Sequence, residues 1–194
     1  MFSTLPGYVV GYHGTSKAIG TEVIHGLGGR HLRPSTQDYE WLGEAVYFWE
    51  NSVARAEEWA LSKHPGEGAV VGAVLQLGTC LDLLDQTYIN IVEAAARNMV
   101  DEMERAGKPI PANSKRGAYR FDCALIEYIK SSKGRYGNFD SARAAYIEGD
   151  PIVGRSEFRR NTHIQIAVFN LNCIKGYFWP VEDSLLTSSV GASI

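Results

Sequence analysis

The chain has 194 residues, of which 45% are hydrophobic and 21% are charged, and its formal net charge is −3 at pH 7. This length suits one domain with a full hydrophobic core, and the composition excludes a disordered or collagen-like chain. A net negative charge does not favour binding to nucleic acid through charge alone.

Cysteine usage and hydropathy indicate where the protein works. The three cysteines form no C-x-x-C pair, so the sequence indicates neither a disulfide framework nor a zinc site. The N-terminal segment lacks a basic region followed by a long apolar run, and no stretch reaches about 18 apolar residues. We therefore expect a cytoplasmic protein that has no signal peptide, binds no metal and does not engage a membrane.

The hydrophobic pattern predicts six strands and four helices. The first strand covers residues 7–13, and Ser16 is placed to cap a short helix through Ile24. Further strands are expected over residues 45–49, 69–77, 142–148, 162–169 and 173–179, and further helices over residues 52–63, 83–106 (one long helix or two short ones) and 121–129. This irregular order indicates an α+β fold rather than a doubly wound parallel sheet. We expect one domain over residues 1–184 and a loose tail over residues 185–194.

The end of the first strand, His13-Gly14-Thr15, is the first of three segments that could carry chemistry. It places an imidazole, a bare backbone and a hydroxyl at one edge of the sheet. Glycine lets a planar ligand approach the main chain, whose N–H and C=O can pair with a carboxamide. A purely structural histidine at the strand end is the alternative.

The second segment is a strand with three consecutive aromatic residues. Alternation puts Tyr47 and Trp49 on one face and Phe48 on the other. One face can pack in the core while the other offers a stacking surface to a ligand. A plain aromatic core strand is the alternative.

The third segment is the strand over residues 162–169, where His163 and Gln165 point to the same face of an otherwise apolar run. Buried polar groups need partners. Either a ligand supplies them, or the two side chains belong to a hydrogen-bonded core.

Charge is distributed unevenly along the chain. Residues 108–135 hold seven basic and two acidic side chains, whereas residues 36–67 hold seven acidic and two basic ones. The basic segment is either a solvated surface or a face that binds an acceptor molecule.

The order of these segments resembles the ADP-ribosyltransferases of the H-Y-E type, the superfamily that contains poly-ADP-ribose polymerases and diphtheria toxin. In that family a strand-end H-G-[ST] precedes a G-x-x-[YF]-[FY] strand, a helix with a second aromatic residue and, late in the chain, a strand that bears a glutamate. His13-Gly14-Thr15 matches the first motif, and residues 43–48 resemble the G-K-G-I-Y-F segment of the polymerases. Trp59 falls close to the second aromatic position, and the strand that contains Gln165 resembles the glutamate strand.

The resemblance implies a split antiparallel sheet with flanking helices, and an NAD molecule bound in a bent form between the two halves of the sheet. The Gly14 backbone would pair with the nicotinamide carboxamide, while His13 and Thr15 would bond the adenosine ribose and the nicotinamide ribose. Tyr47 and Trp59 would sandwich the nicotinamide ring, which leaves before an acceptor attacks the ribose cation. NAD is thus the expected co-substrate, and no metal is required.

One position departs from the family pattern, because Gln165 stands where the family has its glutamate. A carboxylate there bonds a ribose hydroxyl and stabilises the cation-like transition state. Gln165 could keep the hydrogen bond but not the charge, with His163 helping to orient the ribose and the acceptor. Three outcomes stay open: Glu148 on the neighbouring strand supplies the acid, the amide suffices, or the protein binds NAD without transferring ADP-ribose.

The expected function is transfer of ADP-ribose from NAD to a macromolecule, as in toxins of bacterial toxin–antitoxin and phage-defence modules, which implies an antitoxin as a further partner. An NAD glycohydrolase and a non-catalytic module that binds NAD or ADP-ribose are the alternatives. The basic segment favours single-stranded RNA slightly over a protein acceptor. Phosphate contacts would come from Arg116, Arg120 and Lys133, and base stacking from Tyr119 and Tyr136.

Overall fold

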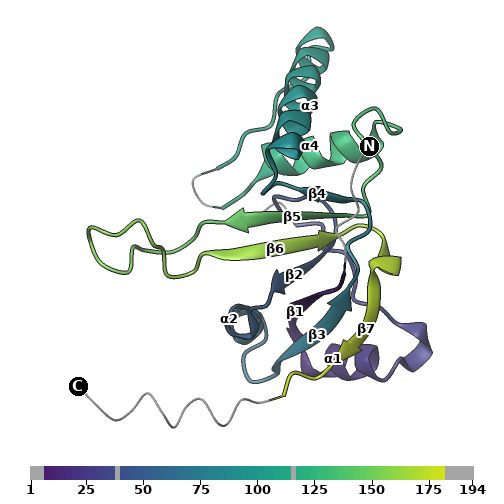
Figure 1. Cartoon of the computed structure of the whole chain (residues 1–194), viewed down its shortest axis with the longest axis vertical. Coiled ribbons are helices and arrows are strands. Elements are labelled where there is room, and N and C mark those ends of the chain that lie inside the picture. Colours follow the sequence, from purple (N-terminus) through teal and green to yellow (C-terminus); the bar gives the residue numbers. More distant parts are fainter. Residues whose placement is uncertain (1–6, 38–39, 115–116, 182–194) are drawn as a thin grey trace.

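The computed structural model describes residues 7–37, 40–114 and 117–181, which form a seven-stranded sheet flanked by helices (Figure 1). The strand order is β4-β5-β6-β2-β1-β3-β7, and all neighbours are antiparallel except β4 and β5, which are parallel. The strands are β1 (Val9–Ser16), β2 (Val46–Glu50), β3 (Gly68–Leu75), β4 (Cys80–Asp82), β5 (Ser141–Tyr146), β6 (His163–Val168) and β7 (Ile174–Phe178). The helices are α1 (Lys17–Ile24), α2 (Val53–Lys63), α3 (Gln86–Arg105) and α4 (Arg120–Ser131), with short 3₁₀ turns η1 (Leu27–Gly29) and η2 (Leu171–Cys173).

The α+β class is confirmed, and so is each predicted helix and strand, with ends that shift by a few residues. The strand β4 is unexpected, because three residues are too few to show a strand pattern. The expected split antiparallel sheet is in fact a mixed sheet, because β4 pairs with β5 in parallel while the other neighbours are antiparallel. The chain between them, which includes α3 and α4, is the long crossover that a parallel pair needs. The predicted tail over residues 185–194 lies outside the described residues.

The sheet opens between β1 and β2. All eight residues of β1 pair with β3, but only Gly11 and Tyr12 pair with β2. Beyond Tyr12, β1 therefore follows β3 and leaves β2. In Figure 1, α2 lies beside this junction.

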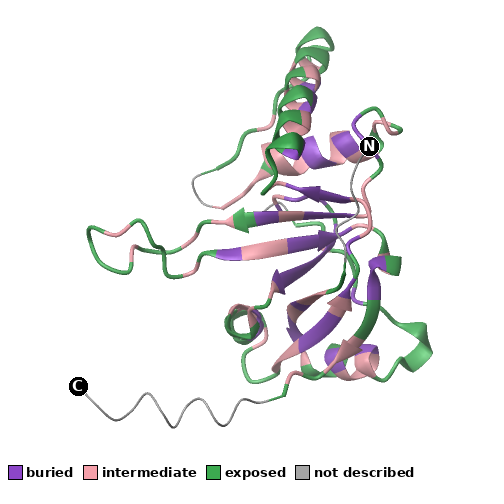
Figure 2. Ribbon diagram, viewed as in Figure 1, coloured by how far each residue is buried: buried purple, intermediate pink, exposed green. Residues whose placement is uncertain are grey.

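Alternation along β2 separates two hydrophobic clusters on opposite faces of the sheet. In Figure 2, β2 is coloured as buried along most of its length. Tyr47 belongs to the cluster that α3 and α4 cover, whereas Phe48 belongs to the cluster that contains residues of α1. The small side chains of Ala142, Ala144 and Ala167 on β5 and β6 leave room for the helices of the first cluster. The aromatic strand is thus a core strand on both faces at this end.

The helix α2 lies directly on β1 and β3 because two glycines leave room for it. A Cβ added at Gly14 would lie 2.9 Å from Trp59 Cδ1 and would collide with the Ala56 carbonyl oxygen. A Cβ added at Gly68 would lie 2.8 Å from the Ala60 backbone. Since folded proteins are close-packed, these glycines fix how near α2, and with it Trp59, comes to the sheet.

The Gly14→Ala substitution should lower the free energy of unfolding by about 1–3 kcal/mol, because the new methyl group forces the α2 backbone away from β1. Urea denaturation measures this change. The matched control is Gly176→Ala in β7, where an added Cβ meets no atom within 4 Å, and it should change stability by less than about 0.5 kcal/mol. Equal stability of the two variants would contradict the close packing of α2.

Candidate functional site

A cavity of about 600 Å³ opens on the face of the sheet that carries Tyr47. Its walls come from the loop before β2, from β2, β5, β6 and α2, and from the residues just before α4. Aromatic side chains dominate these walls, namely Trp41, Tyr47, Trp49, Trp59, Tyr119 and Tyr146. Aromatic walls with a few polar groups are typical of a site for a small molecule or cofactor.

Strand register brings the central wall residues together. Trp49 of β2 lies opposite Gln165 of β6, and Tyr146 of β5 lies opposite His163 of β6. Because side chains directly opposite one another share a face of the sheet, these four side chains form one surface. The His163 ring centroid lies 5.4 Å from that of Tyr146 and 6.2 Å from that of Trp49.

Five of the eight site residues expected from the sequence line this cavity: Tyr47, Trp59, Glu148, His163 and Gln165. They come from β2, α2, β6 and the residues that follow β5. The three residues at the end of β1, residues 13–15, are not among those that line it. The second and third segments singled out in the sequence therefore line the same cavity, whereas the first segment, residues 13–15, does not line it.

The side chain of His13 bridges the opening between β1 and β2. Its Nδ1 lies 2.7 Å from the backbone oxygen of Tyr47 and donates a hydrogen bond to it. The ring sits 5.9 Å from that of Phe48, on the face opposite to the one that α2 covers at Gly14. Thr15 is buried, at 4% exposed. The imidazole thus replaces a backbone ladder bond where the strands part.

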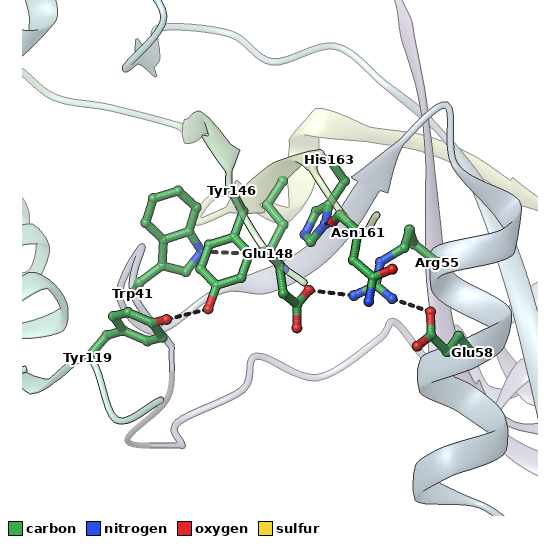
Figure 3. Close-up of polar contacts among 9 residues, drawn as sticks. Trp41, Arg55, Glu58, Tyr119, Tyr146, Glu148, Asn161 and His163 are labelled. Atoms are coloured by element: carbon green, nitrogen blue, oxygen red, sulfur yellow. Dashed lines mark hydrogen bonds and ion pairs between the residues drawn. The ribbon is translucent and has the colours of Figure 1, made fainter. Parts of the chain in front are cut away.

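Polar contacts tie the cavity walls to one another (Figure 3). Trp41 Nε1 donates to Gln165 Oε1, and the hydroxyls of Tyr119 and Tyr146 bond each other. Arg55 pairs with Glu148, at 2.6 Å between Nη2 and Oε2, and also with Glu58. Both predicted acid-site residues, Gln165 and Glu148, therefore already have partners.

Burial changes the titration of groups on the cavity wall. Burial lowers the pKa of His163, and the nearby charge of Arg55 lowers it further, so the imidazole is neutral at pH 7. Burial raises the pKa of the Glu40 carboxyl. Burial, followed by the charge of Glu40, also raises the pKa of Tyr47, whose hydroxyl accepts from Leu42 N and donates to the Gly43 carbonyl.

Three buried polar atoms of cavity residues have no hydrogen-bond partner among the described residues: Trp49 Nε1, Arg55 Nε and His163 Nε2. Buried polar atoms in folded proteins are nearly always satisfied. Nδ1 of the neutral His163 donates to the Asn161 carbonyl at 2.6 Å, so Nε2 is an acceptor. Two donors and one acceptor without partners, gathered at one cavity, point to a ligand.

Several wall residues were missed in the sequence, and for some of them a signal existed. Arg55 lies four residues before Trp59 on a predicted helix, and residues four apart lie on the same face of a helix. Tyr146 lies two residues before Glu148 on a predicted strand and therefore points the same way. Glu40 and Trp41 lie in an irregular loop, where no periodicity indicates which side chain points inward.

Among residues 7–37, 40–114 and 117–181, no group of three or more His, Cys, Asp or Glu side chains is arranged to hold a metal ion. No helix in the described part of the chain has the length and hydropathy needed to cross a bilayer. Comparisons of the chain with protein-family models, with curated proteins and with solved structures gave no match.

The burial of His13 makes stability depend on pH, although its bond to Tyr47 acts in the opposite direction. Burial lowers the pKa of His13 below its ordinary value of 6.5, so the unfolded chain binds this proton more readily than the folded one. The free energy of unfolding should therefore fall as the pH drops from 7 toward 5. Urea denaturation at several pH values should show a smaller fall for His13→Gln than for the wild type. An identical pH dependence in both proteins would show that His13 gains its proton as easily folded as unfolded.

Proposed function

We propose that the protein is an NAD-dependent ADP-ribosyltransferase that transfers ADP-ribose to a macromolecule. One observation carries the proposal: Tyr47 and Trp59 share a single cavity with His163, Gln165 and Glu148. The cavity lies between α2 and the sheet face that β2 and β6 form. The resemblance puts NAD between two halves of a split sheet, so the proposal depends on the shared cavity and not on the opening between β1 and β2.

The cavity has the chemistry that a pyridinium ring needs. Its volume of about 600 Å³ lies within the usual range for small-molecule sites. Stacking of the cationic ring on Tyr47 and Trp59 contributes about 1–2 kcal/mol once the faces are desolvated. The Lys63 ammonium, which lies 4.6 Å from the Trp59 ring centroid, has to move aside for the ring. The unpartnered N–H groups of Trp49 and Arg55 are donors for the carboxamide or for ribose hydroxyls, and His163 Nε2 is an acceptor.

The residues of β1 act at the back of this site. The His13 ring lies beside Phe48, on the face away from the cavity, and its Nδ1 is bonded to Tyr47 O. The bond to the adenosine ribose that the resemblance implies therefore needs the adenosine end of NAD to pass the opening between β1 and β2 and reach Nε2. His13 also positions Tyr47 by holding the two strands together. Gly14 keeps Trp59 close to β1, and its backbone with the Thr15 hydroxyl completes the set that the resemblance implies for the nicotinamide end.

In the reaction, the C–N bond between ribose and nicotinamide breaks, and the electron pair leaves with nicotinamide. The resulting ribose cation is attacked by a nucleophilic acceptor atom, which gives up its proton. Gln165 has its amide nitrogen left to bond a ribose hydroxyl, since its oxygen accepts from Trp41. His163 Nε2, which is unprotonated at pH 7, accepts the proton of the nucleophile.

Single-stranded RNA is the acceptor that we favour. Tyr119 lines the cavity, and Arg120 follows it at the exposed start of α4. Lys133 is also exposed, whereas Arg116 lies outside the described residues. Tyr136 does not stack on a base, because it is 8% exposed and bonds Asn98. Of Tyr119 and Tyr136 in the basic segment, Tyr119 is therefore the one that lines the cavity.

A non-catalytic module that binds NAD or ADP-ribose is the second candidate. Two contacts favour it: Gln165 is held by Trp41, and the Glu148 carboxylate is neutralised by Arg55. Neither group then offers a free negative charge to a ribose cation. This candidate shares the NAD pocket with the first and differs from it only in turnover.

Trp59→Ala should weaken NAD binding at least about tenfold, because losing a stacking face worth about 1.4 kcal/mol has that effect. Isothermal titration calorimetry with NAD⁺ measures the change. Trp179→Ala is the matched control, because Trp179 packs on Gly20 and does not line the cavity. Unchanged NAD⁺ affinity in a folded Trp59→Ala protein would remove the pocket assignment.

Labelled NAD⁺ distinguishes the candidates and the acceptor. After incubation with cell lysate, RNA, DNA and protein are recovered separately. We expect label on RNA, and less of it with Arg120→Glu, because that change reverses a charge beside the cavity. Label on protein alone would contradict the RNA acceptor, free ADP-ribose would indicate a glycohydrolase, and intact NAD⁺ would favour the binding module.

For a toxin, expression without an antitoxin should also arrest growth, and normal growth on strong induction would count against that role.

A further inference from the structure

The carboxyl group of Glu40 lies in the cavity wall and is not part of any expected motif. Glu40 is 8% exposed and lines the cavity beside Trp41 and Tyr47. Its loop is fixed at both ends: Ser35 N donates to the Ala45 carbonyl at 2.8 Å, and Trp41 Nε1 bonds Gln165 across the cavity. The sequence thus places a buried acid at a ligand site and anchors the loop that carries it.

The other acid on the wall is less free to act on a ligand. Glu148 pairs with Arg55 at 2.6 Å, and 42% of its side chain is exposed, so solvent and the guanidinium both reduce its field. No comparable ion pair holds Glu40 among the described residues. Although burial raises the pKa of Glu40 by more, three neighbouring groups, Ser35, Tyr47 and the Lys63 ammonium, each act to lower it. Of the two, Glu40 is therefore the carboxylate more available to a bound ligand.

A buried carboxylate among aromatic faces selects for charge. Aromatic rings attract a cation to their faces, and a low-dielectric wall strengthens the attraction of a nearby carboxylate. A neutral ring of the same shape gains the stacking but not the charge term. The wall also holds two cations: Arg55 is paired with Glu148, and the Lys63 ammonium lies 4.6 Å from the Trp59 ring centroid. Six aromatic side chains and the buried Glu40 carboxyl suit a flat organic cation that replaces the Lys63 ammonium at the Trp59 ring.

We propose that Glu40 makes this cavity selective for a cationic pyridinium ring over a neutral ring of the same size. The selectivity itself needs only the cavity, while the assignment of the pyridinium to NAD⁺ rests on the proposed function. Glu40 then holds the oxidised nicotinamide ring while it is charged and loosens its hold once the ring has left as neutral nicotinamide. The carboxylate would thereby favour release of the leaving group.

The test compares two probes by calorimetry: N1-methylnicotinamide, a cation, and nicotinamide, its neutral analogue. The wild type should bind the cation at least about tenfold more tightly. Glu40→Gln, which keeps the size of the side chain and removes its charge, should reduce this preference to the smaller one that the aromatic faces alone provide. The control is Glu44→Gln in the same loop, where the side chain is exposed, and it should keep the preference. Circular dichroism confirms that each variant is folded.

The pH dependence gives a second readout that a purely structural role would not produce. As the pH falls, protonation of Glu40 removes its charge, and the preference for the cation should decrease. Since burial raises the pKa of Glu40, this decrease should begin at a higher pH than for an ordinary glutamate. The groups that face Glu40 are Ser35 of its own loop, Tyr47 of β2, Lys63 of α2 and Cys123 of α4. Glu40→Gln should show no such transition.

The outcomes separate this inference from the proposed function. An undiminished preference in Glu40→Gln, equal affinity of the wild type for both probes, or no binding of either probe would overturn the inference. Loss of the preference in Glu148→Gln instead of Glu40→Gln would transfer the role to Glu148 and overturn it as well. A wild type that prefers the cation but never consumes NAD⁺ would contradict transfer while supporting Glu40. A wild type that consumes NAD⁺ and shows no preference for the cation would support NAD⁺ as the substrate and contradict the role of Glu40.

Discussion

The short ladder between β1 and β2 determines the form of the site. Two residue pairs join these strands, and beyond them the hydrogen bond from His13 Nδ1 to Tyr47 O is the link that remains. A fully paired β1 would close the sheet and leave no space beside β2. Because β1 turns away instead, α2 can settle on Gly14 and bring Arg55 and Trp59 to the same cavity.

Alternation along β2 gives the strand two tasks. Phe48 packs in the core on one face of the sheet. Tyr47 and Trp49 are buried on the other face, where they also line the cavity. This arrangement leaves buried polar atoms of Trp49, Arg55 and His163 without hydrogen-bond partners among the described residues. Such groups are unfavourable unless a ligand supplies the missing partners, and they occur mainly at functional sites. The same reasoning applies to a buried acid such as Glu40 beside aromatic rings.

Local pattern was enough to predict every helix and strand except β4, and five of the residues that line the cavity. The two-residue period placed Tyr47 with Trp49 and His163 with Gln165, because burial on one face leaves that signal in the sequence. It could not show that Trp49 lies opposite Gln165, since register depends on contacts more than a hundred residues apart. Nor could it show that His13 is bonded to Tyr47, or that Glu40 points inward, because loop conformation follows from packing and not from periodicity.

The most direct measurement is a crystal structure of the protein with an NAD analogue whose glycosidic bond cannot be cleaved. The account predicts that the nicotinamide ring lies between Tyr47 and Trp59, with Trp49 Nε1, Arg55 Nε and His163 Nε2 near its polar groups. An analogue bound elsewhere on the protein, or an empty cavity at a saturating concentration of the analogue, would contradict it.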